Sequence, residues 1–168
     1  MTHLTEPMTA LTDYAVALVS FAFAVAMYRR ITLTNRVSPW FWCAAFLAST
    51  GAAIAGGTFH GFAETLSRGG RDTLWNLSVF LIGATVAFVT AAIHSAHVKR
   101  VDTTVPWLAS AVVVTLVGLA VQQSNFPNSA NFNHNDAYHL IQMVGLYLFF
   151  RCARTTRDRG SFTATVQT

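Results

Sequence analysis

Residues 37–62 read VSPWFWCAAFLASTGAAIAGGTFHGF, a run without any Lys, Arg, Asp or Glu. A helix needs about 20 mostly apolar residues to cross the hydrocarbon core of a bilayer. Ser38 followed by Pro39 is typical of a helix start, because proline fits the first helical turn. Small residues recur through the run, and such residues let helices approach closely in lipid. We therefore predict a membrane-spanning helix in the centre of a bundle.

Four further apolar stretches complete the predicted fold. Together with residues 37–62, the predicted spans are residues 10–28, 74–93, 105–121 and 135–151. The last of them has only a short apolar run, residues 137–150, so we expect the polar residues just before it to be drawn to membrane depth. The predicted fold is an all-α polytopic bundle of five transmembrane helices in residues 1–154, followed by a polar tail in residues 155–168.

The overall composition agrees with a membrane protein. Hydrophobic residues make up 53% of the chain and charged residues only 11%, whereas soluble domains carry about 25% charged residues. The basic residues stand in short clusters beside apolar runs, a pattern that sets membrane topology, so we do not expect nucleic-acid binding. The two cysteines, Cys43 and Cys152, are too few for a metal site of their own and are expected to be buried.

The distribution of positive charge predicts the orientation. No Lys or Arg precedes Arg29, so the first stretch is not a cleavable signal peptide but an anchor with its N-terminus outside. Nine basic residues then fall inside: Arg29, Arg30, Arg36, Lys99, Arg100, Arg151, Arg154, Arg157 and Arg159. Only Arg68 and Arg71 fall outside. This bias places the C-terminus in the cytoplasm, and we expect a multi-pass protein of the bacterial inner membrane.

With this orientation, most acidic residues and histidines gather at the outer side of the membrane. They are Glu6, Asp13, Glu64, Asp72, Asp136, His60, His134 and His139. Asp13 lies within the first apolar stretch, and His139 lies a few residues into the last one. Ionisable groups at membrane depth are costly, which makes these residues candidates for a functional site.

Four of these residues form a candidate zinc site: His60, His134, Asp136 and His139. Neutral imidazoles and a carboxylate are ligands that suit zinc, and a catalytic zinc keeps three protein ligands and one water. Asp13, Glu64 and Asp72 are the candidate catalytic carboxylates that would move protons near such a water. His134 and His139 would point about 140° apart on one helix, so either His134 precedes the helix or Asp136 takes its place.

Two segments resemble a known family. Gly-Gly-Thr-Phe-His at residues 56–60, with Thr65 and Leu66 after it, resembles the Gly-Ser-x-x-Phe-His segment of alkaline ceramidases. Asn-Asp-Ala-Tyr-His-Leu at residues 135–140 resembles the His-Ala-Trp-Trp-His segment of their last helix. Both segments also resemble a group of small bacterial membrane proteins with Gly-Gly-x-x-His-Gly and His-Asn-Asp-x-x-His elements.

Alkaline ceramidases belong to the CREST superfamily of transmembrane hydrolases, with the progestin and adipoQ receptors and haemolysin III. The resemblance implies zinc bound by histidines and hydrolysis of amide bonds in lipids, and His60 and His139 carry over directly. The chain departs from the family where Asn135 replaces the first histidine of the last helix and Gly56 replaces the serine. It also has five predicted helices instead of seven.

Three classes of function remain open. The first is a zinc-dependent transmembrane hydrolase that acts on a lipid or an amphiphilic amide or ester at the non-cytoplasmic face. The second is a redox protein in which His60 and His139 bind one b-type haem. The third is a non-enzymatic bundle, a receptor or a small subunit of a complex, with a polar network that includes Trp75, Asn76, Tyr138 and Gln142. The expected partners are membrane lipids, an amphiphilic small molecule, and either a second copy of the chain or a larger complex.

Overall fold

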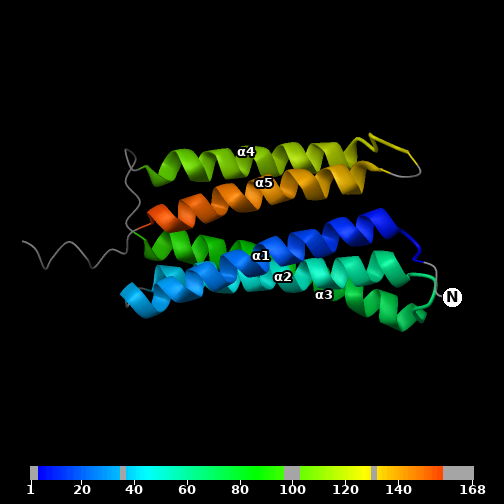
Figure 1. Ribbon diagram of the computed structural model, residues 1–168, viewed down its shortest axis with the longest axis horizontal. Coiled ribbons are helices and arrows are strands. Elements are labelled where there is room, and N and C mark those ends of the chain that lie inside the picture. The colour runs from blue at the N-terminus through cyan, green and yellow to red at the C-terminus, as the bar shows by residue number, and fades with distance from the viewer. Residues whose placement is uncertain (1–3, 35–36, 97–102, 130–131, 157–168) are drawn as a thin grey trace, which may run out of the picture.

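The computed structural model describes residues 4–34, 37–96, 103–129 and 132–156. Within these ranges the chain forms five helices and no strand: α1 (Pro7–Thr34), α2 (Ser38–Phe62), α3 (Arg68–Ser95), α4 (Thr104–Gln123) and α5 (His134–Thr155). The helices lie side by side and run alternately in opposite directions (Figure 1). The predicted all-α fold with five helices is confirmed.

Four helices, α1 to α4, are long and apolar enough to cross a membrane, which makes the chain a membrane protein. The fifth helix, α5, has 22 residues and is about 33 Å long, but it is less apolar than the other four, so its membrane span stays a prediction. It begins at His134, so the polar residues that precede its apolar run form its first turn. Nearly all of the predicted tail at 155–168 lies outside the described residues, as do five of the inner basic residues: Arg36, Lys99, Arg100, Arg157 and Arg159.

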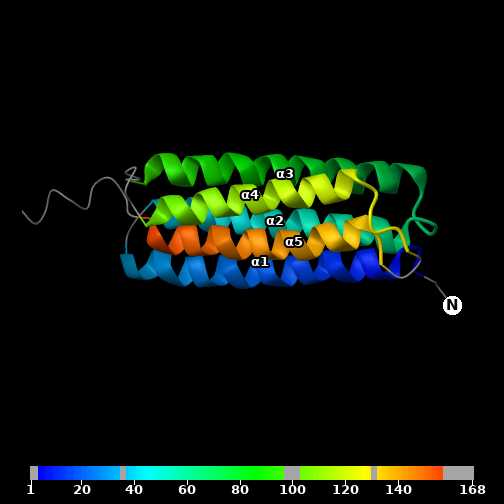
Figure 2. The same ribbon diagram turned by 90° about the horizontal axis from the view of Figure 1, so that it is seen from above.

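The helices form two units, one of three helices and one of two. In the first unit, α2 packs against both α1 and α3, and in the second unit α4 packs against α5. Contact between α1 and α5 joins the two units (Figures 1 and 2). In the most apolar part of α2, 61% of the residues are buried, against 6% in α3, so α2 is the centre of its unit and α3 exposes its apolar side chains.

Aromatic side chains connect the two units in the half of the bundle where α1 and α5 end. The Phe23 ring of α1 stacks on the Phe150 ring of α5 with the ring centroids 4.4 Å apart. Phe46 of α2 contacts the edges of both rings. Aromatic pairs of this kind add to the free energy gained by apolar burial. This part of the contact between the units is therefore apolar, and the polar contacts between the units among the described residues lie at the two ends of the bundle.

At one end of the bundle, Arg30 of α1 joins the units. Its Nη1 donates hydrogen bonds to the carbonyl oxygens of Ala153 and Arg154, at 3.2 and 2.6 Å. These carbonyls belong to the last turn of α5, where backbone oxygens lack helical partners and the helix dipole is negative. We call this the inner end, after the predicted orientation, and the opposite end, with the first turns of α1 and α5, the outer end.

Candidate functional site

A buried carboxylate and histidine meet at the outer end of the bundle. Nε2 of His139 in α5 lies 3.2 Å from Oδ1 of Asp13 in α1. Nδ1 of the same imidazole lies 2.9 Å from Oγ1 of Thr12. Asp13 and His139 are only 6% and 7% exposed. Three side chains from two helices of different units therefore form one buried polar contact.

The Thr12 hydroxyl determines where protons can lie in this contact. It has one hydrogen, and it donates a hydrogen bond to the carbonyl oxygen of Thr9 at 3.0 Å. The contact with His139 can be a hydrogen bond at the same time only if Nδ1 is protonated and donates to Thr12. Nε2 then faces Asp13 Oδ1, and a hydrogen bond between these two atoms requires one further proton. Asp13 and His139 are thus arranged to share a proton.

The polar contacts continue along the first turn of α5. Asn133 is the N-cap of α5, and its side-chain oxygen accepts hydrogen bonds from the backbone amides of Asn135 and Asp136. Asp136 accepts the amide of Asn133 at 2.8 Å, which completes a capping box. The amide group of Asn133 also donates to Thr9 Oγ1 of α1 at 3.3 Å. We call Thr9, Thr12, Asp13, Asn133, Asp136 and His139 the outer-end network.

Two glycines of α2 allow Asp13 to lie against the helix backbone. A Cβ atom on Gly57 would lie 3.0 Å from Asp13 Cβ and 3.3 Å from the Ala10 carbonyl oxygen. A Cβ atom on Gly56 would lie 3.4 Å from both carboxylate oxygens of Asp13. Gly56 and Gly57 belong to the segment on which the family resemblance rests. In the structure they permit the close approach of α1 to α2, because any side chain there would press on α1.

His60, the second histidine that carried over from the resemblance, has a different partner. Its Nδ1 lies 3.1 Å from Oε2 of Glu6, just before α1. Backbone hydrogen bonds from Thr5 and Glu6 to the carbonyls of Gly61 and His60 hold the two segments together. Glu6 and Asp136 interact electrostatically with Asp13, and His60 interacts electrostatically with His139. The two carboxylate–histidine pairs thus form one electrostatic cluster.

The other predicted catalytic carboxylates lie outside this cluster. Glu64 and Asp72 are exposed, and neither carboxylate has a hydrogen-bond or ion-pair partner among the described residues. The backbone amide of Glu64 donates to Thr5 Oγ1 at 3.3 Å. Of the three predicted catalytic residues, the structure brings only Asp13 to the histidines. Thr9, Thr12 and Asn133 were absent from the sequence-based site. The Asn133–Asp136 spacing is a capping-box pattern that could have indicated the start of α5, whereas no local signal marks the two threonines.

The four predicted zinc ligands do not form a metal site as they lie. Across the described residues, no group of three or more His, Cys, Asp or Glu side chains could hold a metal ion. The two ring nitrogens of His139 already contact Asp13 and Thr12, and one ring nitrogen of His60 contacts Glu6. The Asp136 side chain caps α5. The same contacts hold His60 and His139, the two histidines considered as haem ligands. Zinc binding and haem binding stay predictions from the sequence.

Three buried polar atoms of the outer end have no hydrogen-bond partner among the described residues: Asp13 Oδ2, His134 Nδ1 and Asp136 Oδ1. A buried carboxylate oxygen or ring nitrogen without a partner is costly, and such atoms point to a proton, a water or another group at the site. Asp13 Oδ2 belongs to the carboxylate that is arranged to share a proton with His139. The outer-end network therefore has unused capacity to accept hydrogen bonds.

Comparison with known proteins gives one match. A family model described as "Family of unknown function (DUF6962)" matches residues 8–109 and, in a second match, residues 84–158. Together the two matches run through all five helices and include the whole outer-end network. No curated protein and no solved structure matches the chain.

Proposed function

The chain belongs to the DUF6962 family of unknown function, and we propose that it is a proton-responsive membrane bundle, a receptor or a small subunit of a complex. In this proposal a proton held between Asp13 and His139 controls how the α4–α5 unit docks on the α1–α2–α3 unit. The observation that carries the proposal is the buried 3.2 Å contact between Asp13 Oδ1 and His139 Nε2. The charge bias of the sequence supports a place in the bacterial inner membrane with this contact near the outer surface.

The position of the contact explains why one proton would matter. At the outer end, three polar contacts among the described residues link α1 to the start of α5: Thr9 with Asn133, Thr12 with His139, and Asp13 with His139. Without the shared proton, the Asp13 carboxylate and the lone pair of His139 Nε2 face each other in a buried place. Such an arrangement is repulsive and poorly solvated, so the outer end of α5 would separate from α1.

The sign of the pH effect follows from proton counting. The docked state holds one proton between Asp13 and His139, whereas the separated state has a hydrated carboxylate and a neutral imidazole. The docked state therefore binds more protons, and raising the pH favours separation. The groups that surround the pair from the neighbouring segments are Glu6, His60, Asp136 and Tyr138. The shared proton between Asp13 and His139 sets the direction of the pH effect.

A distance measurement across the outer end tests the proposal. Leu11 of α1 and Leu140 of α5 are exposed and accept spin labels as Leu11→Cys and Leu140→Cys, in a background with Cys43→Ala and Cys152→Ala. We expect the distance between the labels to increase as the pH rises between about 5 and 9, where histidine charge changes occur. Pulsed electron resonance of the protein in lipid nanodiscs measures this distance.

The Asp13→Asn variant is the decisive comparison. The asparagine amide can donate to His139 Nε2 without a titrating proton, so this variant should stay docked at every pH. His60→Gln, which changes the neighbouring pair with Glu6, should keep the pH response. A wild-type distance that does not change with pH, or an Asp13→Asn variant that still responds, rules the proposal out.

A zinc-dependent hydrolase that acts on a lipid or an amphiphilic amide or ester is the second candidate. The buried acceptor atoms without partners, on Asp13, His134 and Asp136, favour it because a cation could satisfy them. Zinc, when bound, would supply a nucleophilic water. The side chains as they lie do not form such a site, so His139 or His60 would first have to leave its present partner.

Elemental analysis separates the two candidates. The hydrolase predicts about one zinc per chain in protein purified without chelators, and loss of that zinc in His139→Ala. Glu64→Ala is the control: it removes an exposed carboxylate outside the cluster, and the variant should keep the bound zinc. Metal-free wild-type protein, also after incubation with zinc, excludes the hydrolase and leaves the proton proposal intact.

A further inference from the structure

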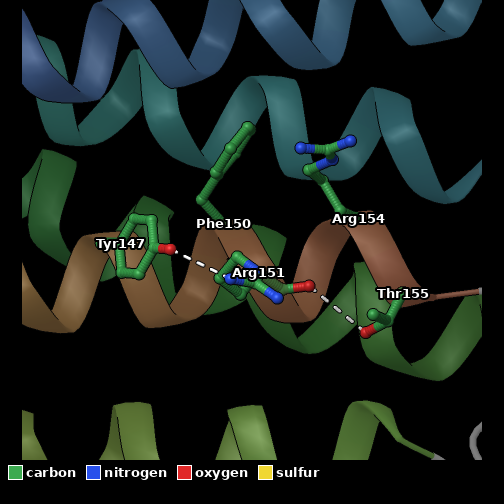
Figure 3. A pocket seen from close by; sticks show the side chains of 5 residues that line it. All are labelled: Tyr147, Phe150, Arg151, Arg154 and Thr155. Carbon is green, nitrogen blue, oxygen red and sulfur yellow. Dashed lines mark hydrogen bonds between the residues drawn. The ribbon is translucent and has the colours of Figure 1, made fainter.

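A basic pocket lies at the inner end of α5, remote from the outer-end network. Its volume is about 360 Å³, and it is lined by Tyr147, Phe150, Arg151, Arg154 and Thr155 (Figure 3). All five residues come from the last turns of α5. Among the described residues the lining contains two arginines and no carboxylate, which favours an anion as the ligand.

Arg151 is held in place by two aromatic side chains. Its guanidinium lies 4.3 Å from the centre of the Trp107 ring of α4. Its Nη1 donates a hydrogen bond to the Tyr147 hydroxyl at 3.0 Å (Figure 3). A cation over an indole face is attracted by the ring and loses side-chain freedom before any ligand arrives. Arg151 therefore presents its remaining N–H groups in a fixed direction.

Arg154 lies one turn further along α5 and is exposed. Its guanidinium lies 5.9 Å from the centre of the Phe150 ring, and the two side chains point to the same side of the helix (Figure 3). Neither arginine takes part in an ion pair in the part of the chain that the structure describes. Two guanidinium groups thus face one pocket without a carboxylate partner there.

These arginines are not needed to neutralise the end of their own helix. Basic side chains in the last turn commonly interact with the free backbone carbonyls of a helix. In this molecule Arg30 of α1 already donates to the carbonyls of Ala153 and Arg154. The side chains of Arg151 and Arg154 consequently remain directed at the pocket.

We propose that the phosphate of an anionic phospholipid binds in this pocket between Arg151 and Arg154. A guanidinium donates two parallel hydrogen bonds to phosphate oxygens, and basic pockets between transmembrane helices at the cytoplasmic side suit anionic headgroups. The Phe150 and Tyr147 rings beside the guanidinium groups offer an apolar surface to the glycerol and the first acyl carbons. The inner end of a spanning helix also lies at the depth of the headgroups.

Thermal unfolding in detergent with added ligand tests the proposal. Phosphatidylglycerol should raise the midpoint of the wild type, whereas phosphatidylcholine and inorganic phosphate should not. Arg154→Gln is the main variant because the Arg154 side chain is exposed. Loss of a charge-assisted hydrogen bond should weaken phosphatidylglycerol binding about tenfold or more. Arg68→Gln removes an equally exposed arginine from the opposite end and should bind like the wild type.

Tryptophan fluorescence supplies a second readout. Because Arg151 covers the Trp107 ring, phosphatidylglycerol should change the fluorescence of the wild type, and this change should vanish in Trp107→Phe. Equal phosphatidylglycerol affinity in wild type, Arg151→Gln and Arg154→Gln would overturn the proposal. Inorganic phosphate that stabilises the protein as strongly as phosphatidylglycerol would also overturn it, because the site would then bind a free anion.

Discussion

At the scale of single residues, Gly57 shows how little space the outer end contains. A Cβ atom at this position would lie 3.0 Å from Asp13 Cβ, which is tighter than nine in ten contacts of real Cβ atoms, so Asp13 would have to shift by a few tenths of an ångström. The glycine therefore sets how deeply Asp13 lies against α2, and through Asp13 it sets the contact with His139. The sequence marked the glycine pair only through a resemblance, and the packing gives the pair its physical role.

We expect Gly57→Ala to destabilise the protein by about 1–3 kcal/mol, because the added methyl group overpacks the contact with Asp13. It should also shift the pH midpoint of docking, since Asp13 must move. Gly83→Ala is the matched control: it lies inside a helix and a Cβ there meets no atom within 4 Å. Reversible unfolding in mixed micelles measures both variants, and equal stability of the two would contradict this account.

At the scale of elements, the start of α5 combines two tasks. The Asn133–Asp136 capping box stabilises the first turn, and the same Asn133 side chain reaches Thr9 of α1. The apolar run of this stretch was short, and the helix nevertheless begins at His134 because the cap satisfies its first amides. Because the cap stabilises the first turn of α5, His139 lies in a formed helix at the same depth as Asp13.

We expect Asn133→Ala to loosen the outer end of α5. Loss of an N-cap costs about 1 kcal/mol, and the link to Thr9 is lost as well. Amide hydrogen exchange at residues 134–139 should become faster, with a smaller effect on the inner half of α5. Ser67→Ala, which removes the N-cap of α3 without a contact to another helix, should affect only the first turn of α3. Unchanged exchange in Asn133→Ala would disprove the dual role.

At the scale of the whole molecule, the two units are joined differently at their two ends. The outer end relies on the Asp13–His139 contact, whereas the inner end relies on Arg30 and carbonyl oxygens that do not titrate. Loss of the shared proton should therefore open one end only, as a hinge. Spin labels at the inner end, in Tyr28→Cys and Arg154→Cys, should keep their distance while those at the outer end separate. Movement at both ends would show dissociation of the units instead.

The sequence by itself determined the fold class. The length and apolarity of each stretch are local properties, and each helix must meet the requirements of the bilayer by itself. It also determined which titratable residues lie at the same end of the bundle. Consecutive helices run in opposite directions, so every second connection lies on the same side. Only the tertiary structure decided that His139 meets Asp13 and Thr12 while His60 meets Glu6. Such pairings depend on the rotation and close approach of helices far apart in sequence, which side-chain packing sets.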